Sequence, residues 1–378
     1  MDRHAAELLA PLIAARPTSP AQWRLVSWDA EQGIQVSLAR GDAVLLVEFE
    51  GRDLARDCYA RTARFNVCAR RAFRADAPLD DGERRAVDQL VAMVRQRERL
   101  LPVLARPAAA RASEVREVEV DRVLMPEGAG RYYLNPYVGC MIGCEFCYAA
   151  ERADFSRGLD GVAALPWGRW VDVKVNAAEV LRREVAQLTP GSVRISPIVT
   201  DPYQPLERRY RITRRCLEVL VEARYTPVVL TRAARIREDY DLLARAPGAV
   251  VGFSIPTDDD AVREAFEPGA DPIEARFEAL AEAHARGLRT VVVVQPVLPM
   301  NVERLLERVA PYARLVRVDR MHRMDRASPL YARGPYAWAA DEAFFERTVT
   351  ALRDGFAARG VRSDDLDDVA DALSGKTS

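Results

Sequence analysis

The sequence is poor in lysine and histidine and lacks any long apolar run. Only Lys174 and Lys376 are lysines, which leaves 53 of the 55 basic residues as arginine. The net charge of −1 gives no overall field that would attract nucleic acid or a membrane surface. We find no run of eighteen apolar residues and no signal-peptide layout. We therefore expect a cytoplasmic protein with an ion-paired arginine surface and without a membrane or nucleic-acid partner.

The few histidines and cysteines restrict the chemistry further. Three histidines lie far apart in the chain: His4, His284 and His322. This spread does not favour chemistry that rests on several histidines. Of six cysteines, three fall within residues 140–147 and three are scattered: Cys58, Cys68 and Cys216. This is not the disulfide framework of a small secreted domain, and clustered thiols in a cytosolic protein usually bind metal.

The first 118 residues are expected to form a small α+β accessory domain. Residues 4–15 have the pattern of a short amphipathic helix, and residues 23–28, 33–38 and 43–49 alternate like a strand meander. A helix is predicted from about Asp81, and the Ala/Pro/Arg stretch 102–114 is the best linker candidate. We expect this domain to cover an edge of the neighbouring fold; binding a peptide and dimerisation are the alternatives.

The rest of the chain alternates strands with helices, which predicts a parallel sheet with helices outside it. The predicted strands are residues 131–137, 192–200, 226–231, 249–255, 290–297 and 315–319. The predicted helices are residues 176–188, 212–223, 235–245, 272–287 and 301–310. We predict an α/β fold, a partial (β/α)6 barrel over residues 119–335. An irregular stretch is expected after residue 320, and a C-terminal helix and tail over residues 336–378.

The segment Gly139-Cys140-Met141-Ile142-Gly143-Cys144-Glu145-Phe146-Cys147-Tyr148 has the form CxxxCxxC. Such spacing lets one loop wrap its thiolates around an iron–sulfur core, which usually takes four cysteines. Three local ligands leave one iron free to chelate a substrate. A structural zinc site needs a fourth ligand, which a distant cysteine would have to supply.

In a parallel barrel the chemistry lies at the carboxyl ends of the strands. Besides the cysteine loop, this rule selects Thr200 and Asp201, Thr231 and Arg232, Ser254, and Gln295. These side chains should converge on one rim.

The cysteine motif at the end of the first barrel strand resembles the signature of the radical S-adenosylmethionine (SAM) superfamily. Four further sequence motifs resemble its spore photoproduct lyase-like branch: Asn135-Pro136-Tyr137-Val138-Gly139-Cys140, Val173-Lys174-Val175-Asn176-Ala177, Thr200-Asp201-Pro202-Tyr203-Gln204-Pro205 and Phe253-Ser254-Ile255. The resemblance implies a [4Fe–4S] cluster on Cys140, Cys144 and Cys147. It also implies reductive cleavage of SAM to a 5′-deoxyadenosyl radical that takes a hydrogen from the substrate, with an electron donor such as flavodoxin or ferredoxin.

The same resemblance implies contacts to SAM, residue by residue. Tyr148 would lie against the adenine, Arg232 would pair with the methionyl carboxylate, and Ser254 would donate to the methionyl or ribose part. The remaining cofactor candidates are Thr200, Asp201 and Gln295. The ordinary alternatives are a surface ion pair for Arg232, a satisfied strand residue for Ser254 and a turn at Asp201-Pro202.

Two departures from the branch bear on the substrate. Ile198-Val199-Thr200 has no thiol where the lyase carries its hydrogen donor, so we do not expect DNA lesion repair. Met141-Ile142 replaces a histidine often found between the first two cluster cysteines. Residues 319–338 are expected to close the site, with His322 and Tyr336 as catalytic or substrate contacts. We expect a small metabolite as substrate; the alternatives are a ribosomally made peptide and a non-catalytic iron–sulfur or zinc protein.

Overall fold

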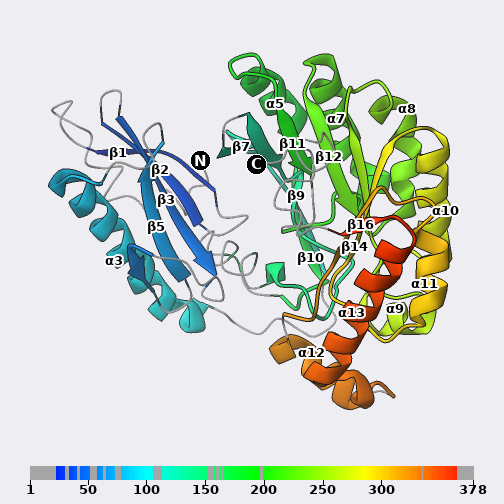
Figure 1. The fold of residues 1–378 in the computed structure, drawn as a ribbon. Helices are drawn as coiled ribbons and strands as arrows, with labels where there is room; N and C mark the ends of the chain where they lie inside the picture. Colours follow the sequence, from blue (N-terminus) through cyan, green and yellow to red (C-terminus); the bar gives the residue numbers. More distant parts are fainter. Residues whose placement is uncertain are drawn as a thin grey trace. The chain divides into compact units, whose positions relative to one another are not determined.

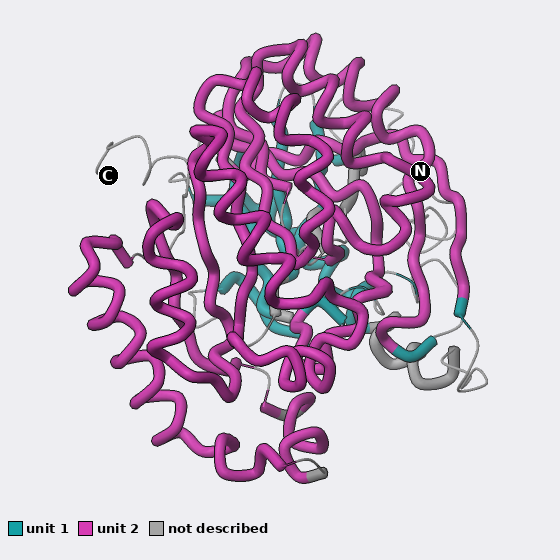
Figure 2. The backbone as a smooth tube through the Cα atoms, turned by 90° about the vertical axis from the view of Figure 1, so that its right-hand side faces the viewer, with its two compact units in different colours: residues 1–113, 149–166 teal, residues 114–148, 167–378 magenta. Residues whose placement is uncertain are grey.

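A computed structural model describes most of the chain. The described residues are 23–29, 34–40, 43–51, 58–62, 65–72, 78–104, 113–128, 130–150, 153, 157, 162, 165–195, 199–322, 324–333 and 335–363. The predicted helix over residues 4–15 and most of the predicted linker lie outside them. The chain divides into two compact units, residues 1–113 with 149–166, and residues 114–148 with 167–378 (Figure 2).

The first unit contains an antiparallel sheet with strand order β1-β2-β3-β5-β4 (Figure 1). Its strands are β1 (Arg24–Asp29), β2 (Ile34–Arg40), β3 (Ala43–Gly51), β4 (Ala60–Arg61) and β5 (Phe65–Arg71). The first three match the predicted meander. Strands β4 and β5 were not predicted, because Asn66, Arg70 and Arg71 obscure the apolar alternation of β5.

Helix α3 (Asp81–Leu104) packs on this sheet. Asp80 and Glu83 form a reciprocal capping box: the Glu83 amide donates to Asp80 Oδ1 over 2.8 Å, and the Asp80 amide donates to Glu83 Oε2 over 2.7 Å. The predicted apolar face of the helix is buried against residues of β2, β3 and β5 and consists of Val87, Leu90, Val91 and Val94. The capping box thus fixes where α3 begins, and the apolar face explains why it packs on the sheet.

The second unit is built on an eight-stranded sheet with the order β16-β15-β14-β13-β12-β11-β8-β7. The strands are β7 (Leu124–Gly128), β8 (Arg131–Leu134), β11 (Ser192–Ile195), β12 (Thr226–Thr231), β13 (Val250–Ser254), β14 (Arg289–Val294), β15 (Leu315–Val318) and β16 (Arg362–Ser363). All neighbours pair in parallel except β7 with β8. The six predicted parallel strands and the α/β class are thereby confirmed.

Helices connect these strands, and most of them cover one face of the sheet (Figure 1). They are α5 (Ala177–Val185), α6 (Glu207–Tyr210), α7 (Ile212–Glu222), η1 (Ala234–Asp239), α8 (Tyr240–Leu243), α9 (Asp260–Phe266), α10 (Ile273–Ala285), α11 (Val302–Val309), α12 (Met324–Arg333), η2 (Ala337–Ala339) and α13 (Glu342–Ala358). Helix α12 corrects the expectation of an irregular stretch after residue 320. Among the described residues no helix is both long enough and apolar enough to span a bilayer.

The first predicted barrel strand is divided in two. After β8 the chain turns into β9 (Tyr137–Gly139), which pairs antiparallel with β10 (Trp170–Lys174). Strand β10 pairs in parallel with β6 (Glu114–Val118). The second unit therefore begins at residue 114, whereas the sequence places the boundary after residue 118. It also includes α13, which packs against α11 and β15.

Side chains of the parallel sheet alternate between two faces. Val292 and Val294 of β14, and Val316 and Val318 of β15, join one apolar core with helix residues. The residues between them, such as Val293 and Arg317, lie on the opposite face. This face is the one available to ligands at the carboxyl ends of the strands.

We predict that Leu90→Ala destabilises the first unit by about 2–5 kcal/mol, because it removes a fully buried side chain from the interface of α3 with the sheet. Urea unfolding followed by circular dichroism measures the effect. The exposed neighbour Gln89→Ala is the control and should change little. Equal stability of the two variants would contradict the packing of α3.

Candidate functional site

The three motif cysteines lie on one tightly curled loop. Cys140 and Cys144 are buried, and Cys147 is half-buried. Gly139 and Gly143 have positive φ values of 82° and 68°. A Cβ atom on Gly139 would lie 2.5 Å from the Trp170 carbonyl oxygen, and one on Gly143 would lie 3.1 Å from Gly168 Cα. Glycine is thus required at both positions for the loop to close.

The thiols interact electrostatically with one another and with their surroundings. Burial raises the pKa of Cys140 to about 12, against the backbone amides of Asp201 and Ile142, which lower it. Burial also raises the pKa of Cys144 strongly, while the charge of Arg232 lowers it. The thiols of Cys140 and Cys144 are therefore protonated at neutral pH, and binding an iron–sulfur cluster would release their protons.

Among the described residues no three side chains of His, Cys, Asp or Glu converge closely enough to enclose a single metal ion. The assignment of Cys140, Cys144 and Cys147 as cluster ligands therefore stays a prediction. Three neighbouring thiols on a loop that curls at Gly139 and Gly143 are a donor set that fits an iron–sulfur cluster.

One side of the cysteine loop is held by the segment that follows β11. The hydroxyl of Thr200 donates to the Gly139 carbonyl over 2.7 Å. The side-chain amide of Gln204 donates to Thr200 Oγ1 over 2.9 Å and accepts the Met141 N–H over 3.0 Å. Thr200, predicted as a cofactor contact, thus holds the start of the cysteine loop through the Gly139 carbonyl.

The other side of the loop is held by the turn between α9 and α10. The Glu145 amide donates to the Phe266 carbonyl over 3.0 Å, and the Gly269 amide donates to the Ile142 carbonyl over 2.9 Å. A Cβ atom on Gly269 would lie 2.5 Å from the Met141 carbonyl oxygen. Only glycine permits this approach of the two backbones.

Asp201 joins the ends of two strands. Its carboxylate accepts from the amides of Tyr203 (2.9 Å) and Arg232 (2.8 Å) and from the Thr231 hydroxyl (2.5 Å). Burial raises the pKa of Asp201, and these three donors oppose the rise. The Asp201 carboxylate is therefore engaged in hydrogen bonds within the protein. Asp201 thus links two strand ends, in addition to forming the turn that was its ordinary alternative.

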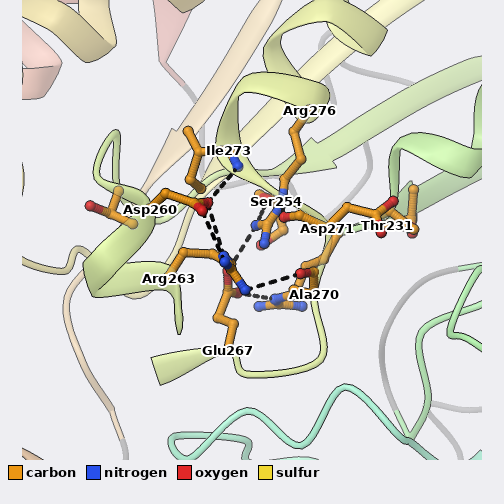
Figure 3. A network of polar contacts seen from close by, with 12 residues as sticks. Thr231, Ser254, Asp260, Arg263, Glu267, Ala270, Asp271, Ile273 and Arg276 are labelled. Atoms are coloured by element: carbon orange, nitrogen blue, oxygen red, sulfur yellow. Dashed lines mark hydrogen bonds and ion pairs between the residues drawn. The ribbon is translucent and has the colours of Figure 1, made fainter. Parts of the chain in front are cut away.

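A buried chain of charges extends from Arg232. Its Nε atom donates to Glu267 Oε1 over 2.5 Å. Arg276 Nη1 donates to Glu267 Oε2 over 2.8 Å and to the Ser254 carbonyl over 3.0 Å, and these three residues are labelled in Figure 3. The side chains of Glu267 and Arg276 are 0% exposed. Burial acts to raise the pKa of Glu267, but the two arginines lower it overall. The Arg232 guanidinium also lies 5.8 Å from the ring centroid of Phe146, within the cysteine loop.

Hydrogen bonds and an ion pair hold the turn that carries Glu267 in place. Asp260 pairs bidentately with Arg263 over 3.0 and 2.9 Å and accepts the Ile273 amide over 3.0 Å (Figure 3). Arg263 also donates to the Ala270 carbonyl over 3.3 Å. These contacts fix the path from α9 to α10 and thereby the position of Glu267.

The remaining predicted residues fall into separate places. Ser254 is buried at the end of β13, and Tyr148 is 45% exposed. Gln295 and His322 meet at Asp319, at distances of 3.2 and 2.8 Å. Tyr336 is half-buried, with its ring 5.5 Å from that of Phe266. The rim thus has a group around the cysteine loop and a second group around Asp319.

Sequence reasoning did not select Gln204, Glu267, Gly269 or Arg276. Gln204 is part of the family-like motif Thr200–Pro205, so the sequence offered a reason to select it. Glu267-Pro268-Gly269 reads only as a turn after a helix, because the pairing of a buried glutamate with two distant arginines leaves no local pattern.

Comparison with known families identifies the class. Residues 134–310 match the radical SAM superfamily, so the chain carries a radical SAM domain. The predicted resemblance to this superfamily is thereby confirmed. The domain is that of radical SAM enzymes, which typically use a [4Fe–4S] cluster and SAM.

The curated relatives match about half of this chain. An uncharacterised protein of Methanocaldococcus jannaschii is 26% identical over 48% of this chain and 67% of its own length. An uncharacterised protein of Mycobacterium tuberculosis is 31% identical over 48% of this chain and 55% of its own length. The radical SAM Nalpha-GlyT isomerase of Pseudomonas phage M6 is 29% identical over 47% of this chain and 36% of its own length. The chain thus spans about half the length of the curated relatives it matches.

Two solved structures of low identity superpose in part on this chain. Spore photoproduct lyase complexed with dinucleoside spore photoproduct superposes with a TM-score of 0.47 at 12% identity, over 66% of this chain and 80% of that one. Streptococcus suis SuiB bound to the precursor peptide SuiA gives a TM-score of 0.42 at 12% identity, over 86% and 61%.

We predict that Gly269→Ala lowers the iron bound on anaerobic reconstitution at least threefold, because the new methyl group displaces the backbone of the cysteine loop. Iron is measured by a colorimetric assay. Gly287→Asn is the control, since its φ of 74° suits asparagine and a Cβ there meets nothing within 4 Å. Wild-type iron content in Gly269→Ala would refute the close approach of the two segments.

We predict that Glu267→Gln lowers the free energy of unfolding by about 3–5 kcal/mol at pH 7, because two buried arginines lose their shared carboxylate. The lowered pKa of Glu267 means that its contribution is present above its ordinary pKa of 4.5 and is lost as the pH falls through the folded-state value. The gap between variant and wild type should therefore narrow below about pH 4.5. Urea unfolding at pH 7 and pH 4 measures it.

The matched control for this variant is Glu264→Gln, which removes a carboxylate whose side chain is 70% exposed. It should change stability little at either pH. A Glu267→Gln protein as stable as Glu264→Gln at pH 7 would contradict the role of the buried pair.

Proposed function

We propose that Cys140, Cys144 and Cys147 hold a [4Fe–4S] cluster and that the chain cleaves SAM reductively to modify a small substrate. The observation that carries this proposal is the three-thiol loop of a radical SAM domain, clamped on both sides by backbone hydrogen bonds. When bound, cluster and SAM supply the electron transfer and the 5′-deoxyadenosyl radical that takes a hydrogen from the substrate. An external donor such as flavodoxin or ferredoxin would deliver the electron.

The chain's own residues would bind and orient the cofactors. Arg232 uses Nε on Glu267, so the terminal nitrogens of its guanidinium remain for the methionyl carboxylate of SAM. Ser254 lies at the end of β13, and its backbone carbonyl accepts a hydrogen bond from Arg276. Its hydroxyl would therefore remain for the methionyl or ribose part of SAM. We assign Thr200 and Asp201 to positioning, because their side chains already bond the cysteine loop and β12.

The exposed ring of Tyr148 directly follows the last cysteine, which supports a role in stacking on the adenine. Tyr336, beside Phe266, would help to exclude water from the site. Gln295 and His322 share Asp319, and we assign both to the substrate side.

The phage relative is named an isomerase, and an isomerisation needs no second substrate. Hydrogen-atom abstraction also needs no general base, which accords with the three histidines of the sequence.

Anaerobic reconstitution tests this function. We expect about four irons and four sulfides per chain and dithionite-dependent 5′-deoxyadenosine from SAM. Cys144→Ala should lower 5′-deoxyadenosine formation at least tenfold. Cys58→Ala removes a half-buried thiol of the other unit and is the matched control, with unchanged iron and product. A colourless wild-type protein with zinc on these thiols would exclude the proposal.

A further inference from the structure

A polar cluster lies at the carboxyl ends of β14 and β15, formed by Gln295, Arg317, Asp319 and His322. Asp319 Oδ2 accepts from Gln295 Nε2 (3.2 Å) and contacts His322 Nε2 (2.8 Å) and Arg317 Nη2 (3.6 Å). The Arg320 amide donates to Asp319 Oδ1 over 2.8 Å. Three hydrogen bonds and the longer contact to Arg317 thus converge on the Asp319 carboxylate. Its role is to order the donors around it.

The ionisation of Asp319 accords with this role. Burial acts to raise the pKa of Asp319, but the hydrogen bond and charge of His322, the Arg320 amide and Arg317 lower it overall. The carboxylate is therefore charged at neutral pH and holds its donors in place.

Arg317 lies on the face of the sheet opposite the helices. Its neighbours in β15, Val316 and Val318, belong to the core that includes the helices, and side chains alternate along a strand. Arg317 pairs in register with Val293, which pairs with Ser254 of β13. Arg317 and Ser254 are thus two strand spacings apart, roughly 10 Å, on the same face. A small molecule bound at this cluster would reach a cofactor held at Ser254.

The donors of Arg317 are incompletely used. Its Nε atom is buried and has no hydrogen-bond partner among the described residues, and the one ion pair that it forms with them spans 3.6 Å. The side chain is 31% exposed, so a ligand can reach it. Arg276 Nη2 is also buried without a described partner, but that side chain is fully enclosed. Buried donors in native proteins nearly always meet an acceptor, and for Arg317 a bound molecule can supply it.

The free donors of this cluster select the ligand's charge. Asp319 already accepts three hydrogen bonds, and the nearby Glu342 pairs with Arg320. What faces a ligand is the guanidinium of Arg317 and the exposed imidazole of His322. Planar guanidinium groups match oxyanions, which accept two parallel hydrogen bonds.

We propose that this cluster binds an oxyanion of the substrate, a carboxylate or a phosphate, with Arg317 as its main donor. This inference rests on the proposed function and adds the substrate's chemical class to it. The substrate is then an anionic small molecule anchored at β14 and β15 while its reacting carbon lies toward the cofactor at β13.

The test is the melting temperature of the anaerobically reconstituted protein, followed by circular dichroism, in increasing inorganic phosphate or acetate at constant ionic strength. Ligands that bind only the folded state raise this temperature saturably. We expect saturable rises for the wild type and at least tenfold weaker apparent binding for Arg317→Gln. The tighter of the two anions identifies the group as phosphate or carboxylate.

Arg314→Gln is the matched control, because it removes an equally charged side chain next to the opposite end of β15. It should bind as the wild type does. Arg317→Lys keeps the charge but lacks Nε, and binding should weaken to an intermediate degree; this variant decides the matter where Arg317→Gln does not fold. Absence of saturable binding in the wild type, or wild-type affinity in either Arg317 variant, overturns the inference.

The outcome is separable from that of the proposed function. A wild-type protein that forms 5′-deoxyadenosine but shows no saturable anion binding contradicts only the oxyanion site. A protein that binds the anion but assembles no cluster contradicts only the proposed cofactor chemistry.

Discussion

The carboxylate of Glu267, shared by two buried arginines, is the contact on which the arrangement of the site depends. It connects Arg232 after β12 with Arg276, which in turn holds the last carbonyl of β13. A buried charge without a partner is strongly destabilising, so none of the three groups can move alone. The turn that bears Glu267 also bonds the backbone of the cysteine loop. One interaction therefore fixes two strand ends and the thiol loop together.

This dependence explains why the loop needs glycine where it does. A loop clamped from both sides by backbone hydrogen bonds leaves little room for Cβ atoms at its contacts. Gly143 meets the Cα of Gly168, and Gly269 meets the Met141 carbonyl. On the other side, Gln204 accepts the Met141 amide, a contact that does not involve the Met141 side chain. This contact therefore holds the backbone of the loop whichever residue stands at position 141.

Sequence reasoning recovered the parts of the fold that depend on local patterns. Apolar runs such as residues 291–294 predict β14, and the cysteine spacing predicts the thiol loop. Strand β5 was missed because its polar residues hide the alternation, and α12 because Pro329 lies inside it. For the site, Arg232 and Asp201 were selected by their places at strand ends. Glu267 and Arg276 were not, because their importance arises from burial and from partners far apart in the chain.

The carboxyl edge of the sheet divides its residues by how completely they are paired. Around β11 to β13, the polar atoms of Thr200, Asp201 and Glu267 bond other parts of the protein, which would give the proposed cofactor a rigid support. Around β14 and β15, Asp319 accepts three hydrogen bonds, but Arg317 retains a buried donor without a described partner. A substrate site has to be empty between turnovers, so its donors must tolerate the absence of the ligand. Partial exposure of Arg317 allows this tolerance, because water can serve its terminal nitrogens when no oxyanion is bound.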